Sequence, residues 1–244
     1  LFFKVSKPAA VMGAVAFGFS TYLIIILGVG HNTKALAIGY MPWVVLGVLY
    51  LLHHQPRKGI PITILATALQ LHANHYQMTY YMLWFIGVVM VVYGYQHLKQ
   101  KSPILFLKSL GLVTLSMCLA LTFNATHLLA TKEYSAQSTR GENPLKTDPD
   151  GLPLAQNDGL TYDYITEFSY GILESINLLI PRFMGGGSGD RLGSDSKLMD
   201  FLQGVDSESA QQIYRYASLY WGDQPIVEAP AYVGAAVFFL AVFG

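Results

Sequence analysis

The first 132 residues of this chain contain no aspartate or glutamate, although the 244-residue sequence has 15 acidic residues. All 15 lie between Glu133 and Glu228, whereas nine of the 15 lysines and arginines lie within the first 132 residues. A soluble domain of that size normally has surface charges of both signs. The missing carboxylates, together with an overall hydrophobic content of 52%, exclude an ordinary soluble domain there and predict a membrane-embedded one.

Cysteine is also scarce, because Cys118 is the only one and lies in an apolar run. A single cysteine excludes intrachain disulfides and sites built from several thiolates. Basic stripes of the kind that bind nucleic acid are absent, so we expect no nucleic-acid partner. The glycine-rich stretch 183–196 does not match the G-x-x-x-x-G-K-[ST] pattern of a phosphate-binding loop, and we predict a flexible loop there.

Long apolar runs predict an all-α polytopic membrane protein, that is, a transmembrane helical bundle with a large extracytoplasmic loop segment of mixed helix and coil. We expect the bundle in residues 1–130, the extracytoplasmic acidic segment in 131–229 and the start of a further transmembrane helix in 230–244. The expected spans are about 9–29, 35–54, 60–74, 77–95 and 103–125. The chain has no initiator methionine and ends within an apolar run, so we expect an internal fragment of a longer protein.

The apolar run from 60 to 95 is interrupted by the polar stretch LQLHANHYQ at 69–77. As one helix it would be roughly 54 Å long, against a hydrocarbon core of about 30 Å. The basic clusters at 4–7, 57–58 and 99–101 are expected on the cytoplasmic side, which requires this run to cross twice. The polar stretch then forms a tight extracytoplasmic turn. One long tilted helix with buried polar residues is the alternative.

The acidic segment has apolar residues at helical spacing from Ile165 to Ile180. We therefore predict an amphipathic helix across this range, lying on the membrane surface. Asp206 is the expected N-cap of a later helix. Tyr220 and Trp221 suit the headgroup zone of a bilayer, because aromatic side chains with a polar edge are enriched there.

Several polar residues are candidates for binding. His72 and His75 are three positions apart and adjacent on a helix, which suits a metal or phosphate site. No carboxylate lies near them in the sequence, so hydrogen bonding in a cavity and interfacial anchoring are the alternatives. Lys132 and Arg140 follow a span directly and suit an anionic headgroup or a lipid phosphate, with ordinary juxtamembrane charge as the alternative.

The absence of aspartate and glutamate also limits the chemistry that the first 132 residues can perform. Transfer of a sugar to a hydroxyl generally needs a carboxylate base, or a metal held by carboxylates. The base must therefore come from the acidic segment or from outside this chain. Weak candidates within the segment are Glu133 and Asp223.

Five segments, in this order, resemble the YfhO family of bacterial polytopic membrane proteins, and the resemblance extends over the whole chain. They are residues 16–42, LQLHANHYQMTYY at 69–81, FNATHLLATKEYSAQSTRG at 123–141, residues 163–187 and YWGDQPIVEAPAYVGA at 220–235. That family is grouped with the GT-C glycosyltransferases, which have many transmembrane helices and polyprenyl-phosphate sugar donors. The resemblance implies a multi-pass enzyme of the bacterial plasma (inner) membrane that transfers a sugar to a cell-envelope glycan on the outer face.

The same resemblance implies roles for particular residues. The catalytic aspartate of that fold usually lies in the first extracytoplasmic loop, which would precede Leu1. We therefore expect no cofactor in this fragment. Whether the full-length protein binds a divalent cation is left open by the sequence. Residues that match family-like segments at the outer face are His31, Asn32, His72, His75, Ser138, Arg140 and Asp223.

We expect Arg140, with Lys132, to hold the lipid-linked phosphate. The residues expected to line the sugar cavity are His72, Asn74, His75 and Gln77. Tyr220 and Trp221 would stack on sugar faces or anchor the chain at the interface. Two other functions stay open, a transporter or flippase for a lipid-linked or small polar substrate with its site at the polar helix break, and a non-catalytic membrane scaffold.

Overall fold

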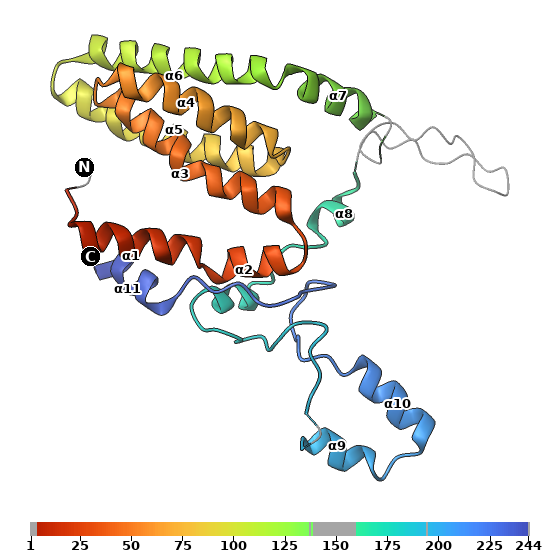
Figure 1. Ribbon diagram of the computed structural model, residues 1–244. Coiled ribbons are helices and arrows are strands. Elements are labelled where there is room, and N and C mark those ends of the chain that lie inside the picture. The colour runs from red at the N-terminus through yellow and green to blue at the C-terminus, as the bar shows by residue number, and fades with distance from the viewer. Residues whose placement is uncertain (1–3, 137, 139–159, 194, 244) are drawn as a thin grey trace. The chain divides into compact units, whose positions relative to one another are not determined.

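The computed structural model describes residues 4–136, 138, 160–193 and 195–243 (Figure 1). Within these residues the regular structure is helical, and the one β-type pairing is an isolated bridge between Gly185 and Tyr220. The predicted all-α class is confirmed for this part of the chain. The chain divides into two compact units, of which unit 1 comprises Leu1–Gly18 and Gly30–Gly159, and unit 2 comprises Phe19–Val29 and Leu160–Gly244.

Unit 1 is built mainly from long apolar helices, and unit 2 from short helices joined by irregular segments. The helices of unit 1 are α1 (Lys7–Gly18), α3 (Asn32–Leu52), α4 (Pro56–His72), α5 (Tyr76–Lys99), α6 (Pro103–Phe123) and α7 (Ala125–Ala136). Those of unit 2 are α2 (Thr21–Gly28), α8 (Tyr162–Thr166), the 3₁₀ helix η1 (Leu173–Leu178), α9 (Lys197–Leu202), α10 (Ser207–Tyr216) and α11 (Ala235–Phe243).

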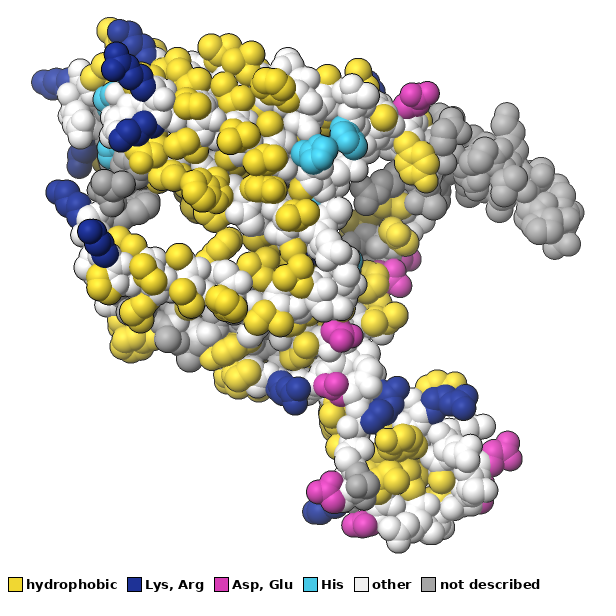
Figure 2. Space-filling view, in the orientation of Figure 1, with side chains coloured by type: hydrophobic (Ala, Val, Ile, Leu, Met, Phe, Trp, Pro, Cys, Tyr) yellow, Lys and Arg dark blue, Asp and Glu magenta, His cyan; other side chains and the backbone are white. Residues whose placement is uncertain are grey.

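Four helical segments among the described residues are long and apolar enough to cross a membrane, which indicates a membrane protein. They are Lys7–Gly28, Asn32–Leu52, Tyr76–Lys99 and Pro103–Phe123. The first of them consists of α1 and α2, which Phe19 and Ser20 separate. With 17 residues, α4 is about 26 Å long, shorter than a hydrocarbon core of about 30 Å. Figure 2 shows hydrophobic side chains along the outer sides of the α4–α6 helices.

Tight turns join α3 to α4, α4 to α5 and α5 to α6, and each has one residue in the left-handed region. The angle φ is +57° at His54, +56° at Asn74 and +54° at Lys101. The N–H of each of these residues donates to the carbonyl three positions earlier, which closes the preceding helix as a C-terminal glycine usually does. The run from 60 to 95 is therefore two helices and not one continuous helix.

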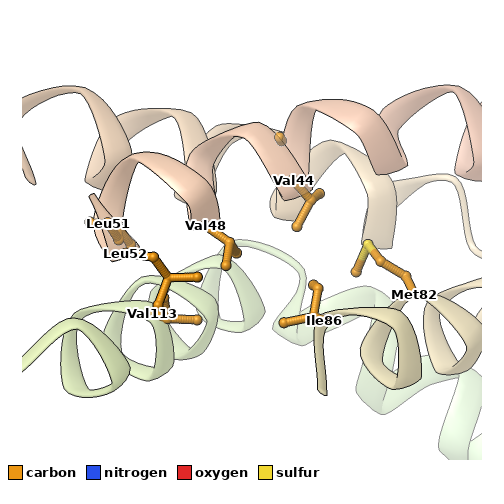
Figure 3. Close-up of a cluster of buried hydrophobic side chains, with 8 residues drawn as sticks. Val44, Val48, Leu51, Leu52, Met82, Ile86 and Val113 are labelled. Atoms are coloured by element: carbon orange, nitrogen blue, oxygen red, sulfur yellow. The ribbon is translucent and has the colours of Figure 1, made fainter. Parts of the chain in front are cut away.

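The core of unit 1 lies between α3, α4, α5 and α6 (Figure 3). Its buried side chains are Val44, Val48, Leu51, Leu52, Ala66, Met82, Ile86 and Val113. Glycine lets α3 and α4 approach closely, because a Cβ on Gly47 would lie 2.5 Å from Thr63 Oγ1 and 2.7 Å from the Thr63 backbone nitrogen. Small residues at a helix crossing are the usual means of close packing in lipid, where helices gain little from hydrophobic burial.

Two polar residues fix α6 against the α3–α4 pair. Near the start of α6, Ser109 Oγ donates to the Leu51 carbonyl at 2.9 Å. Just past its end, Asn124 Nδ2 donates to the Ala68 carbonyl at 3.0 Å. Both side chains are buried. These hydrogen bonds, one at each end, set the axial position of α6 in the bundle.

The prediction of one amphipathic helix from Ile165 to Ile180 is wrong. The range contains only α8 and η1, and residues between and beside them are not helical. Its apolar stripe is not the buried face, since Ile172 is 93% exposed and the acidic Glu174 is 1% exposed. A local hydrogen bond from Gly171 and a tertiary one from Tyr220 hold Glu174 and override the helical periodicity of the sequence.

The glycine-rich stretch predicted as a flexible loop is closely packed in its first part. A Cβ on Gly185 would lie 1.8 Å from the Leu219 carbonyl oxygen, and one on Gly187 would lie 2.0 Å from that of Glu228. Gly185 has a φ of +89°, which glycine adopts without strain. The predicted N-cap of α10 is confirmed, because Asp206 Oδ1 accepts from the Ser209 N–H at 2.9 Å.

Candidate functional site

Three segments that are distant in the sequence meet at one end of unit 1. Ala37 of α3 packs on Ala73 and Met78 of the α4–α5 turn. The rings of His72 and His127 lie edge to face with centroids 5.2 Å apart, which joins the end of α4 to α7. We call this end, with the α4–α5 turn at its centre, the polar end.

The predicted sugar-cavity residues lie here but do not form one cluster. His72 contacts His127, whereas the electrostatic neighbours of His75 are Lys34 and His31. Asn74 is the left-handed residue of the α4–α5 turn. Gln77 Nε2 donates to the Tyr81 hydroxyl at 2.9 Å. The described residues contain no group of three or more histidine, cysteine, aspartate or glutamate side chains placed to hold a metal. His31 and Asn32 are exposed at the start of α3.

Burial beside the turn changes the chemistry of His75. Desolvation, followed by the positive charge of Lys34, lowers the pKa of His75 below its usual 6.5. Its Nδ1 atom is buried without a hydrogen-bond partner. Gln70, just before the turn, is fully buried, and its Oε1 accepts from Thr79 Oγ1 at 3.1 Å while its Nε2 has no partner. His75 and Gln70 therefore offer polar atoms that a polar ligand or water can satisfy.

A pocket of about 480 Å³ lies beside α7, still within unit 1. Leu128, Thr131, Lys132 and Ser135 recur at helical spacing on one face of α7 and line it. The remaining lining residues are Tyr76 of α5, Tyr134 and Ser138. Lys132, which is predicted to hold the lipid-linked phosphate, and Ser138, which matches a family-like segment, thus share one cavity.

The other candidates in this region have different positions. Glu133 is exposed on α7 and is not among the residues that line the pocket. Arg140 lies outside the described residues. Of the predicted phosphate-binding pair, the structure therefore describes Lys132 alone. Lys132 shares the pocket lining with four hydroxyl side chains of 131–138, those of Thr131, Tyr134, Ser135 and Ser138.

Unit 2 contains a pair of carboxylates that the sequence did not reveal. Glu174 of η1 is 1% exposed, and its Oε2 accepts from the Gly171 N–H at 2.8 Å. Its Oε1 accepts from the Tyr220 hydroxyl, which in turn accepts from the Gln224 N–H at 3.0 Å. A Cβ on Gly171 would lie 2.1 Å from Asp223 Oδ2 and 3.4 Å from Glu174 Oε2, so glycine leaves the space where the two carboxylates converge.

This arrangement determines the roles of the two aromatic candidates. Burial, together with the hydrogen bond to Glu174, raises the pKa of Tyr220 to about 12, so its hydroxyl stays protonated at neutral pH. Trp221 is 76% exposed and free to contact a ligand or a bilayer surface. The sequence singled out Asp223 and Tyr220 as candidates but not Glu174, which lies off the apolar positions of the helix predicted from Ile165 to Ile180. Only tertiary structure brings Glu174 to Tyr220, 46 residues away.

Comparisons of the chain with protein-family models, with curated proteins and with solved structures give no match.

Proposed function

We propose that this chain is part of an integral membrane glycosyltransferase of the YfhO type, which moves a sugar from a polyprenyl-phosphate donor to an envelope glycan at the outer face of a bacterial plasma membrane. The observation that supports it best is the α7 pocket, where Lys132 lies among hydroxyl side chains next to apolar membrane helices. A polyprenyl phosphate needs the same combination, an apolar surface for its chain and a cationic, hydrogen-bonding site for its head.

Lys132 supplies the positive charge in this proposal. An ammonium group has three rotatable donors and binds phosphate oxygens through charge-assisted hydrogen bonds. Thr131 adds a hydroxyl donor to the lining of the pocket. The Ser135 and Ser138 hydroxyls donate to the carbonyls of Lys132 and Ser135 at 2.8 Å each, so they add polar oxygen atoms and no free donor. Tyr76 offers an aromatic face for the first sugar ring.

Within unit 2, Asp223 is the better candidate for a catalytic base. A glycosyl acceptor hydroxyl must lose a proton as it attacks the anomeric carbon, and an exposed carboxylate can accept that proton. Asp223 is exposed, whereas Glu174 beside it is buried and already accepts two hydrogen bonds. Within unit 2 we therefore propose Asp223, and not Glu174, as a proton acceptor, with a positioning role for Glu174.

The test compares Lys132→Ala and Ser135→Ala with Lys7→Ala, an exposed lysine of α1 in the same unit. In membranes that contain the full-length protein, we expect Lys132→Ala to raise the KM for a polyprenyl-phosphate sugar roughly 10- to 100-fold, as loss of a hydrogen bond to a charged group does. Lys7→Ala should leave transfer unchanged. Unchanged transfer in Lys132→Ala, or an equal loss in Lys7→Ala, would contradict the assignment.

One observation favours a transporter or flippase as the second candidate. Thr63, Thr67 and Gln70 of α4 are buried at helical spacing, and each has a side-chain atom without a hydrogen-bond partner. Such a stripe can line a polar path through a bundle. Liposomes that contain the protein and no acceptor should then move a fluorescent lipid-linked sugar between leaflets, and Thr67→Val should slow this movement. Absence of movement in those liposomes eliminates this candidate.

A further inference from the structure

A pocket of about 640 Å³ lies in unit 2, between α9, α10 and the segment that precedes them. Its volume falls in the range of about 300–1,000 Å³ that small-molecule sites occupy. Apolar side chains of Met199, Leu202 and Tyr214 line part of the pocket, and Arg191 and Arg215 are also among its lining residues. Figure 2 shows hydrophobic side chains in the middle of the α9–α10 part, with lysine or arginine side chains at one edge.

Arg191 is held in one orientation by the backbone around it. Its Nη1 donates to the carbonyls of Ser188 at 2.8 Å and Asp190 at 3.0 Å, and its Nη2 donates to the carbonyl of Arg215 at 3.1 Å. A guanidinium group has five N–H donors, so two are left for a ligand. Because its plane is fixed, little rotamer entropy is lost when an anion binds.

The two arginines of this pocket have no carboxylate partner within the described residues. The ion pair found in this part of the chain joins Arg182 to Asp190 at 3.9 Å, outside the pocket lining. Arg191 and Arg215 therefore place two positive charges at the pocket, and no carboxylate of the described residues forms an ion pair with either of them. A ligand with an anionic group would match this charge.

We propose that this pocket binds a sugar residue that bears a carboxylate, as an acidic unit of a glycan does. Arginine matches a carboxylate with two parallel hydrogen bonds. The Tyr214 ring suits the C–H face of a pyranose, and the Gln203 and Gln211 amides offer both donors and acceptors for its hydroxyls. This inference concerns binding alone and does not depend on the proposed transfer reaction.

A membrane surface fits these features less well. A helix that lies on a bilayer presents a convex apolar face with basic residues on the opposite side. Here the apolar side chains and the two arginines line one pocket. The helices on both sides are also capped, by Ser196 for α9 and Asp206 for α10, which keeps the pocket preformed.

The experiment measures binding to the full-length protein in detergent, by saturation-transfer NMR and titration calorimetry. The probes are methyl glucuronide, methyl glucoside and glucose 6-phosphate, and vesicles of phosphatidylglycerol serve as the lipid probe. We expect methyl glucuronide to bind at least about tenfold more tightly than methyl glucoside, because only the former has the charged group that arginine pairs with.

Arg215→Gln is the decisive variant, since the Arg215 guanidinium makes no hydrogen bond in the described structure that folding would need, and Arg191→Gln is the second. Both should weaken glucuronide binding about tenfold or more. Arg182→Gln, an arginine of unit 2 outside the pocket, should bind as the unchanged protein does. Equal binding of the two methyl glycosides would overturn the proposal. Tighter binding of glucose 6-phosphate than of methyl glucuronide would also overturn it. So would Arg215-dependent binding to the phosphatidylglycerol vesicles without any binding of methyl glucuronide.

Discussion

At the residue scale, Glu174 shows how tertiary contacts reverse the meaning of a sequence pattern. A glutamate off the apolar stripe of a helical pattern is normally solvated, yet Glu174 is 1% exposed and accepts from Gly171 and Tyr220. A buried carboxylate is tolerated only when its oxygens are hydrogen-bonded. The spacing of residues in 165–180 contains no signal for a partner 46 positions away, so this contact could not be predicted.

The Glu174–Tyr220 contact can be tested by a double-mutant cycle. We expect Glu174→Gln and Tyr220→Phe each to lower the free energy of unfolding by about 1–3 kcal/mol, because each leaves a buried polar group with a poorer partner. The double variant should lose less than the two single losses together, as neighbours in one network do. Chemical denaturation followed by fluorescence measures this. Additive losses would show that the two side chains act independently.

Asn124 gives a second prediction at this scale, since it begins the N-glycosylation sequon NAT at 124–126. In the structure its amide is buried and donates to Ala68 and Ala120, so its role is to hold α6 on α4. Asn124→Ala should lower the free energy of unfolding by about 1–3 kcal/mol. Thr126→Ala also removes the sequon but leaves these bonds intact, and should have little effect on thermal unfolding. Equal effects of the two substitutions would argue against the hydrogen-bonding role.

At the element scale, the turns of unit 1 were more predictable than its helix contacts. Charge distribution and run length predicted a break near LQLHANHYQ, and the structure has it at Ala73–His75. By contrast, nothing in the local sequence distinguishes Gly47, which packs on Thr63, from Gly39, which has no atom within 4 Å of a Cβ at its position. Helix pairing depends on residues that are distant in the chain, so a pattern within one helix cannot reveal it.

These two glycines of α3 make a matched pair of variants. Gly47→Ala should separate α3 from α4, because its Cβ would overlap the Thr63 backbone, at a cost of about 1–3 kcal/mol for overpacking. Gly39→Ala should be neutral or stabilising by up to about 1 kcal/mol, since alanine favours the helix. Thermal unfolding in detergent measures both. The packing account fails if Gly47→Ala is as stable as Gly39→Ala.

At the scale of the whole molecule, composition predicted more than any motif did. The absence of acidic residues before Glu133 coincides with the long helices of unit 1, and ten of the 15 acidic residues lie in the irregular unit 2. The basic residues beside the α3–α4 and α5–α6 turns lie at one end of unit 1, where the rings of His54 and His97 are 5.5 Å apart. The polar end is opposite. Which side of a membrane each end faces stays a prediction.

Histidines at both ends of unit 1 predict how its stability depends on pH. Burial lowers the pKa of His53 below 6.5, aided by the nearby positive charges of His54 and His97. At the polar end, burial and the charge of Lys34 lower the pKa of His75. Because the unfolded chain has the ordinary pKa, it takes up protons first as the pH falls through about 6.5. Protonation therefore favours unfolding, and the stability present above pH 6.5 decreases below it.

We expect the thermal midpoint of the protein in detergent to decrease as the pH is lowered from 7.5 to 5.5. His53→Gln and His75→Gln should each reduce this decrease, and the double variant should reduce it most, because the glutamine side chain does not titrate. The two histidines lie at opposite ends of the bundle, so their effects should add, as those of distant sites usually do. An equally steep pH dependence in the double variant would show that other groups control the acid sensitivity of unit 1.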